Sequence, residues 1–135
     1  MRGASAINDL LREFDDARLR VLAVWEPVLI TDISPPTTLV LGLLDDPRAA
    51  QFWDPGRVVS EDIVSGVSAD PARYGMDQPL PRDFIAWDVV AVFTTDAHWE
   101  GQLPSPVYYG GPVEDVIEET RRSLIDQLVP GSRAR

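Results

Sequence analysis

The chain has 135 residues, a hydrophobic share of 44% and a formal net charge of -10 at pH 7, which together predict one globular domain spanning residues 1–135 and exclude a disordered chain. The 22 acidic residues against 12 basic ones exclude nucleic acid as a main partner, because its phosphates would be repelled. The absence of cysteine excludes disulfides, thiol redox chemistry and thiolate metal sites.

The sequence of the amino terminus and the length of the apolar runs indicate where the protein is located. Residues 1–11 lack the long apolar core of a secretion signal, and no apolar run approaches the ~20 residues that a membrane helix needs. We therefore predict a soluble, cytoplasmic protein without a membrane partner.

The first half of the chain predicts a helix followed by a β-α-β unit. Residues 5–18 carry apolar side chains at three- and four-residue steps, which is typical of an amphipathic helix. Residues 19–25 form a mostly apolar run that predicts a strand covered on both faces. A short helix is expected after the prolines at 35–36, and residues 48–53 are expected to form a second strand, parallel to the first.

The second half predicts a helix, a long loop, a β-hairpin and a final helix. The helix opens at residues 54–56 and fades at Gly66, and the loop over residues 68–82 contains three prolines. Residues 84–93 and 107–109 are expected to pair as antiparallel strands. The final helix follows a Gly-Gly-Pro turn and keeps its acidic residues early and its arginines later.

This order of elements resembles the thioredoxin fold over nearly the whole chain, and a proline just ahead of the hairpin, Pro79 or Pro81, fits the same pattern. The phrases VWEP, DPRAAQFWD, AWDVVAVF and AHW look like those of a group of uncharacterised bacterial thioredoxin-like proteins. The resemblance implies an α/β fold with a central mixed four-stranded sheet, made of the βαβ unit and the hairpin. Helices would flank this sheet, and the helix at the amino terminus would be an addition to the fold.

One departure from the family limits what the resemblance implies. Thioredoxins carry their reactive Cys-X-X-Cys after the first strand of the βαβ unit, so its counterpart should lie within residues 25–32 (WEPVLITD), where no cysteine stands. The oxidoreductase activity and its catalytic residues therefore cannot be transferred to this chain. The resemblance implies a redox-inactive protein that keeps the fold and its groove.

Three tryptophan-acid pairs mark the candidate site. In the implied sheet order, residues 25–26, 53–54 and 87–88 approach a shared rim at the carboxyl ends of the parallel strands, where ligands bind in open α/β sheets. Carboxylates gathered there would have to bind a cation or keep a proton. The expected groove consists of Trp25, Glu26, Pro27, Asp32, Trp53, Pro81, Trp87 and Asp88.

Each of these residues also has a structural interpretation. Asp54 precedes a proline and is more simply a helix cap, while Glu26 can point into water from a loop. Asp88 lies in an apolar strand, where a buried carboxylate needs donors and can serve the structure alone. The tryptophans can fill the core. The D-x-H-x-E segment at residues 96–100 is more simply a solvated turn than a metal site.

Two functions follow from these residues. The first is a protein- or peptide-binding module that uses the groove, an edge strand and the loop at residues 68–82. The alternative is an enzyme or metal-binding protein built on an acidic cluster of Glu26, Asp32, Asp54 and Asp88, with Asp88 as the buried acid or base. No cofactor and no metal are predicted, and the edge strand could also pair in a homodimer.

Overall fold

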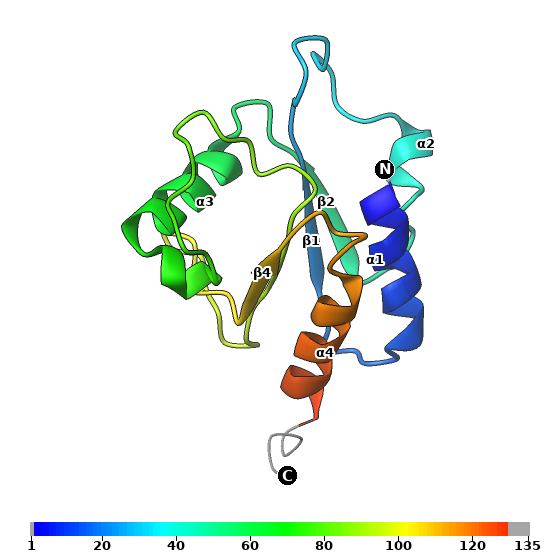
Figure 1. Cartoon of the computed structure of the whole chain (residues 1–135). Helices are drawn as coiled ribbons and strands as arrows, with labels where there is room; N and C mark the ends of the chain where they lie inside the picture. Colours follow the sequence, from blue (N-terminus) through cyan, green and yellow to red (C-terminus); the bar gives the residue numbers. More distant parts are fainter. Residues whose placement is uncertain (1, 130–135) are drawn as a thin grey trace.

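The computed structural model describes residues 2–129 as an α/β structure (Figure 1). The order of elements along the chain matches the prediction. The elements are α1 (Arg2–Glu13), β1 (Val21–Trp25), α2 (Thr38–Leu41), β2 (Ala49–Trp53), α3 (Val58–Ala69), the 3-10 helix η1 (Pro71–Tyr74), β3 (Val90–Val92), β4 (Tyr108–Gly110) and α4 (Ile117–Leu128).

The predicted βαβ unit is confirmed. Strands β1 and β2 pair in parallel over their whole length, and the last pair of this register joins Trp25 to Trp53. The helix between them, α2, is a single turn of four residues that ends at Gly42. Gly42 and the two threonines at the start of the turn, Thr37 and Thr38, are poor helix formers, which explains why the crossover is mostly irregular.

The predicted four-stranded sheet is wrong. Strands β3 and β4 pair antiparallel with each other and form a second two-stranded sheet, separate from β1 and β2. The predicted strand over residues 84–93 is reduced to Val90–Val92. Asp88 has a φ of 55°, and the N–H of Trp87 donates to the carbonyl of Ile85 at 2.7 Å. This tight, left-handed turn cannot be part of a strand.

Helix α3 and η1 hold the hairpin through a compact apolar core. Ile63, Val67 and Tyr74 are buried in it, and Val67 is fully enclosed. The rings of Tyr74 and Tyr109 meet edge to face, with their centroids 5.8 Å apart. Because Tyr109 belongs to β4, this contact fastens the hairpin to the α3 side of the molecule.

A largely buried arginine fastens β2 to α1. Arg48 pairs with Asp46 at 2.8 Å and also donates to the carbonyl oxygens of Leu11, at 2.6 Å, and of Phe14. A cation is favourable there because the carbonyls at the end of a helix carry partial negative charge. Hydrogen bonds from Arg48 hold the pKa of Asp46 at about 2, below its usual value.

One face of the β1–β2 sheet is apolar and open to solvent. Leu22 is 70% exposed, and Val24 and Phe52 on the same face are also exposed, so the prediction that β1 is covered on both faces is wrong. On the opposite face, the indole N–H of Trp25 donates to the side chain of Gln51 at 3.0 Å, and Gln51 donates to the carbonyl of Leu41.

A pair of leucine substitutions tests this exposed face. We expect Leu22→Ala to lower the free energy of unfolding by about 0.5 kcal/mol or less, because the side chain is already in water. Leu11→Ala, at a residue that is 2% exposed, should lower it by about 2–5 kcal/mol. Urea unfolding of both variants measures the difference. Equal losses would mean that the Leu22 face is covered in solution.

Two further observations concern the peptide bonds before proline and the length of the helices. Among residues 2–129, the cis peptide bond joins Gly111 to Pro112, so the bonds before Pro79 and Pro81 are trans. No helix in that part of the chain is both long and apolar enough to span a membrane.

Candidate functional site

Glu26 joins three segments of the chain. Its carboxylate accepts hydrogen bonds from the backbone N–H of Ser60, at 3.0 Å, and from the Ser60 hydroxyl. The same hydroxyl accepts a hydrogen bond from the N–H of Ala86 at 2.9 Å, and Ser60 is only 2% exposed. Glu26 therefore does not point freely into water, and it ties the end of β1 to α3 and to the segment that precedes β3.

The surroundings of Glu26 raise its pKa above the usual value. Burial is the largest cause, and the negative charge of Asp54 adds to it, whereas the hydrogen bonds from Ser60 and the charge of Arg57 act in the opposite direction. A carboxyl group with a raised pKa holds its proton longer in the folded protein than in the unfolded chain. Its contribution to stability therefore falls as the pH rises from about 4.5 through the raised pKa.

Replacing Glu26 with glutamine tests this linkage. We expect the stability of Glu26→Gln relative to the wild type to increase as the pH rises from 4 to 8, because the variant has no carboxylate to desolvate. Glu61→Gln, at an exposed residue of α3, is the matched control and should follow the wild-type pH profile. Urea unfolding across this pH range gives the three profiles. A constant difference between Glu26→Gln and the wild type would contradict the raised pKa.

Asp54 and Asp32 organise the backbone near the ends of β2 and β1. The carboxylate of Asp54 accepts hydrogen bonds from the N–H groups of Gly56, at 3.2 Å, and Val59, at 2.9 Å. The prediction that the helix opens at residues 54–56 with Asp54 as its cap is wrong in position, because α3 begins at Val58 after Arg57, but the Asp54 carboxylate still binds an N–H of its first turn. Asp32 accepts from the N–H groups of Val28 and Leu29 at 3.0 and 2.8 Å. Both side chains therefore have structural roles.

Asp88 lies ahead of β3 and next to α1, away from the hydrogen bonds that engage Glu26 and Asp54. It is partly buried in a bend ahead of β3, so the prediction that it lies within a buried strand is wrong. A side chain at Gly3 of α1 would overlap the Asp88 carboxylate, and the Asp88 carbonyl accepts the N–H of Val113 at 3.0 Å. Within residues 2–129, no group of three or more His, Asp or Glu side chains is arranged to hold a metal ion.

The left-handed turn at Asp88 sets the position of Trp87. Aspartate tolerates a positive φ better than most residues, although the conformation is still uncommon. The turn leaves the Trp87 side chain 68% exposed at the edge of a cavity. A large aromatic side chain exposed to water beside an apolar groove is a feature of binding surfaces.

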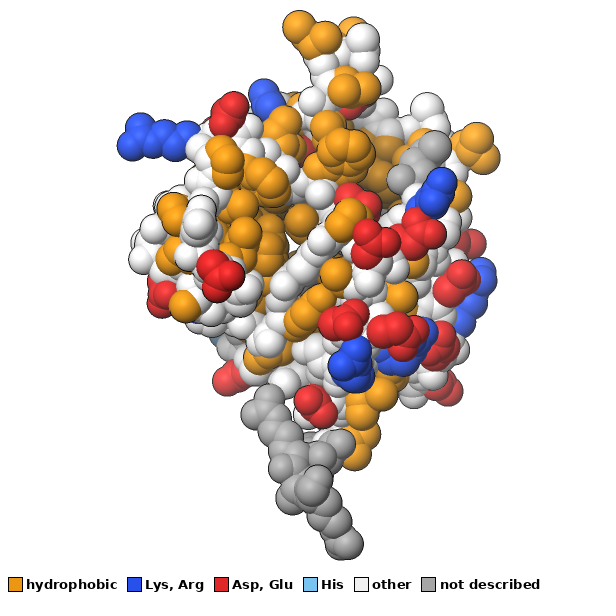
Figure 2. All heavy atoms as spheres, in the orientation of Figure 1, with side chains coloured by type: hydrophobic (Ala, Val, Ile, Leu, Met, Phe, Trp, Pro, Cys, Tyr) orange, Lys and Arg blue, Asp and Glu red, His pale blue; other side chains and the backbone are white. Residues whose placement is uncertain are grey.

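The cavity beside Trp87 is an open groove of about 390 Å³ lined mostly by aromatic and aliphatic side chains. Figure 2 shows hydrophobic side chains gathered in a hollow beside the segment of β4. Its lining is formed by Tyr74, Met76, Leu80, Phe84, Trp87 and Tyr109, together with Val89 and residues 110–112.

Glycine at position 111 allows the wall of this groove to form. A Cβ at Gly111 would lie 2.7 Å from the carbonyl oxygen of Asp88, so a larger residue would push the end of β4 away from the Asp88 turn. Tyr74 and Tyr109, whose rings meet edge to face, both line the groove, and burial raises the pKa of Tyr109. The groove is therefore built on core residues and exists before any ligand binds.

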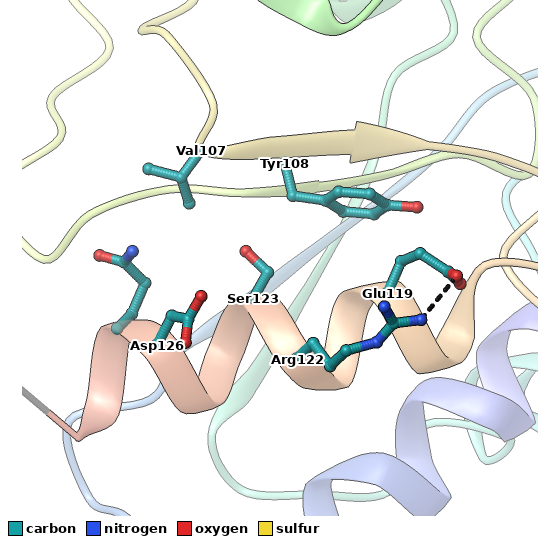
Figure 3. A pocket seen from close by; sticks show the side chains of 7 residues that line it. Val107, Tyr108, Glu119, Arg122, Ser123 and Asp126 are labelled. Carbon is teal, nitrogen blue, oxygen red and sulfur yellow. Dashed lines mark hydrogen bonds and ion pairs between the residues drawn. The ribbon is translucent and has the colours of Figure 1, made fainter. Parts of the chain in front are cut away.

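A second pocket lies between β4 and α4 and is polar (Figure 3). It measures about 260 Å³ and is lined by Val107, Tyr108 and residues of one side of α4. Figure 3 shows Arg122 turned toward Glu119, with which it pairs at 2.8 Å. Because its cation is already paired and it offers no nucleophile with an adjacent base, this pocket is the weaker candidate.

The residues that were predicted to form one groove lie in several different parts of the structure. Trp87 lines the groove, and Pro81 is exposed in the loop that forms one side of it. Trp25 and Trp53 face each other as register partners in β1 and β2, and Pro27 lies in the loop after β1. Sequence reasoning did not name Tyr74, Met76, Leu80, Phe84 or Tyr109 as groove residues, although the first three lie in the loop over residues 68–82 that it assigned to binding.

Comparison of the chain with protein-family models, with curated proteins and with solved structures finds no match.

Proposed function

We propose that the chain is a redox-inactive binding module that holds an extended, proline-containing apolar segment of another protein in the groove beside Trp87. The observation that carries this proposal is the exposed indole of Trp87 at the edge of an aromatic groove. The order of the elements supports a thioredoxin-like relationship as part of the same proposal.

The lining of the groove suits a peptide in the polyproline II conformation. Such segments bind between aromatic side chains, and they lose little conformational entropy on binding because their backbone is already extended. Phe84, Trp87 and Tyr109 supply aromatic surface to one open cavity, which the almost fully buried Tyr74 also lines. An open groove admits a chain that continues past both ends, as a segment of a larger protein must.

The alternative function, an enzyme built on Glu26, Asp54 and Asp88, has one observation in its favour. The raised pKa of Glu26 is typical of general acids and bases. However, both oxygens of Glu26 accept hydrogen bonds from Ser60, and Asp54 is engaged by the start of α3. Since these carboxylates already serve the fold, we favour the binding module.

A library of displayed proline-containing peptides tests the proposed function. The library is selected on the wild-type chain and, in parallel, on Trp87→Ala. We expect the wild type to enrich a family of peptides that share apolar residues and prolines, and the variant to lose them because the groove has lost its largest contact. Equal enrichment on both proteins, or enrichment on neither, would contradict binding at Trp87.

A further inference from the structure

The segment after β1, residues 26–37, is called the β1 loop here and exposes three aliphatic side chains to water. Ile30 is 98% exposed, Ile33 is 88% exposed and Leu29 is 65% exposed. Figure 1 shows the β1 loop standing out from the body of the molecule beyond the end of β1, and Figure 2 shows hydrophobic side chains on the same projecting part. Aliphatic side chains exposed together on one projection mark a surface that binds another apolar surface.

Hydrogen bonds within the β1 loop hold its tip in a defined shape. The Asp32 carboxylate accepts from the N–H groups of Val28 and Leu29, and the Asp32 N–H donates to the Leu29 carbonyl at 2.9 Å. The one carboxylate near the aliphatic residues is therefore engaged by the backbone of the loop itself. A segment that already has a fixed shape loses less conformational entropy on binding.

The β1 loop belongs to the class of segment that the groove beside Trp87 is proposed to hold. Its aliphatic residues stand between Pro27 on one side and Pro35 and Pro36 on the other. The described residues that line the groove are all uncharged. A contact between the aliphatic part of the loop and the groove therefore buries no unpaired charge.

The β1 loop and the groove are separate surfaces of one molecule. The residues that line the groove come from other parts of the chain, and both Ile30 and Trp87 are exposed in the same structure. A contact between the two surfaces therefore needs a second copy of the chain. In a dimer with twofold symmetry, each copy places its loop in the groove of the other, so the dimer contains two such contacts.

The area of this exchange is close to what a stable dimer needs. Three aliphatic side chains that leave water bury roughly 300 Å², at about 100 Å² each, and the groove that receives them loses a similar area. Because each copy supplies one loop and one groove, about 600 Å² per copy is buried by these groups before backbone and prolines are added, against the ~800 Å² per partner of a standard interface. The groove, at about 390 Å³, has the size of sites that hold apolar ligands.

We propose that two copies of the chain associate by exchanging their β1 loops, each loop lying in the groove beside Trp87 of the other copy. This inference rests on the proposed function and names the bound protein as a second copy of the same chain. Because each copy carries a net charge of -10, the copies repel each other at long range. Added salt screens this repulsion and therefore strengthens the association.

Sedimentation equilibrium of the wild type and three variants tests the exchange. We expect the wild type to show a concentration-dependent equilibrium between monomer and dimer, and Ile30→Asp and Trp87→Ala each to raise the dimer dissociation constant about tenfold or more. Leu22→Asp is the matched control, because it places the same charge at an exposed apolar residue outside the loop and the groove. This control should keep the wild-type dissociation constant.

An equimolar mixture of Ile30→Asp and Trp87→Ala distinguishes loop exchange from other contacts. One variant keeps its groove and the other keeps its loop, so a mixed dimer has one intact contact, whereas a dimer of either variant alone has none. We expect the mixture to form more dimer than either variant at the same total concentration.

A synthetic peptide of residues 26–37 tests the same contact with one partner in excess. We expect it to bind the wild-type chain and to dissociate the dimer, because it competes for the groove. A control peptide with serine in place of the aliphatic residues at positions 29, 30 and 33 should do neither.

The outcomes separate this inference from the proposed function. A wild-type chain that stays monomeric up to about 1 mM would overturn the exchange, since weaker association has little specificity. Loss of the dimer in Leu22→Asp, its persistence in Trp87→Ala, or a mixture that associates no better than its components would also overturn it. Library peptides that bind at Trp87 would support the proposed function in each of these cases. If the library yields none and Trp87→Ala dimerises as the wild type does, both proposals fail.

Discussion

Replacing Trp87 with alanine should weaken the binding of a library-selected peptide by about 30- to 700-fold, which corresponds to the ~2–4 kcal/mol of a central aromatic contact. The same change should alter the free energy of unfolding little, because the side chain is 68% exposed in the absence of a ligand. Calorimetry for binding and urea unfolding for stability measure the two effects on the same protein.

Trp99 provides the matched control for this substitution. It is also exposed, but its indole N–H donates to Asp62 at 3.0 Å and it does not line the groove. Trp99→Ala should bind the selected peptide as the wild type does. If both alanine variants lose binding to the same degree, the contact is not specific to Trp87 and the groove is not the site.

The second large effect is expected at Tyr74, which belongs both to the core and to the groove. Tyr74 is 3% exposed, packs with Ile63 and Val67, and meets Tyr109 edge to face. Tyr74→Ala should lower the free energy of unfolding by about 3–5 kcal/mol, because it removes a buried ring and leaves a cavity. Urea unfolding measures this loss.

Tyr74→Phe separates the ring from its hydroxyl. This variant keeps the packing volume and should cost about 1 kcal/mol or less, and it should retain peptide binding. Gly66 leaves the space that the Tyr74 hydroxyl occupies, because a side chain at that position would overlap the hydroxyl. A loss below about 1 kcal/mol for Tyr74→Ala would show that α3, η1 and β4 do not share the core described here.

The sequence correctly predicted those helices and strands whose pattern of apolar residues lies within one short segment of the chain. The apolar runs VLAVW and AAQFW identify β1 and β2, and the long crossover between them, which contains α2, permits parallel pairing. The last helix has a clear helical period. The separate hairpin could not be predicted, because the pairing of β1 with β3 depends on contacts between distant segments, and the apolar run around Asp88 hides a left-handed turn.

Part of the candidate site could also be predicted, because some of its residues stand out within their own segment of the sequence. The sequence pointed to Trp87 and to the loop that contains Pro81, because an aromatic residue and prolines are local features. The sequence did not reveal that Tyr109 of β4 packs on Tyr74, because neither segment carries a pattern that indicates contact with the other. Glu26 and Asp54 were expected near each other, and their electrostatic interaction agrees with that, but their hydrogen bonds serve the fold.

The indole N–H signals of the four tryptophans give the most direct test of peptide binding in the groove. Each signal is assigned in a ¹H–¹⁵N spectrum with single-tryptophan variants, and the protein is titrated with a library-selected peptide. The account predicts a large shift of the Trp87 signal, while the signals of Trp25, Trp53 and Trp99 stay in place. A shift at Trp25 or Trp53 with Trp87 unmoved would place binding at the ends of β1 and β2 and contradict the groove.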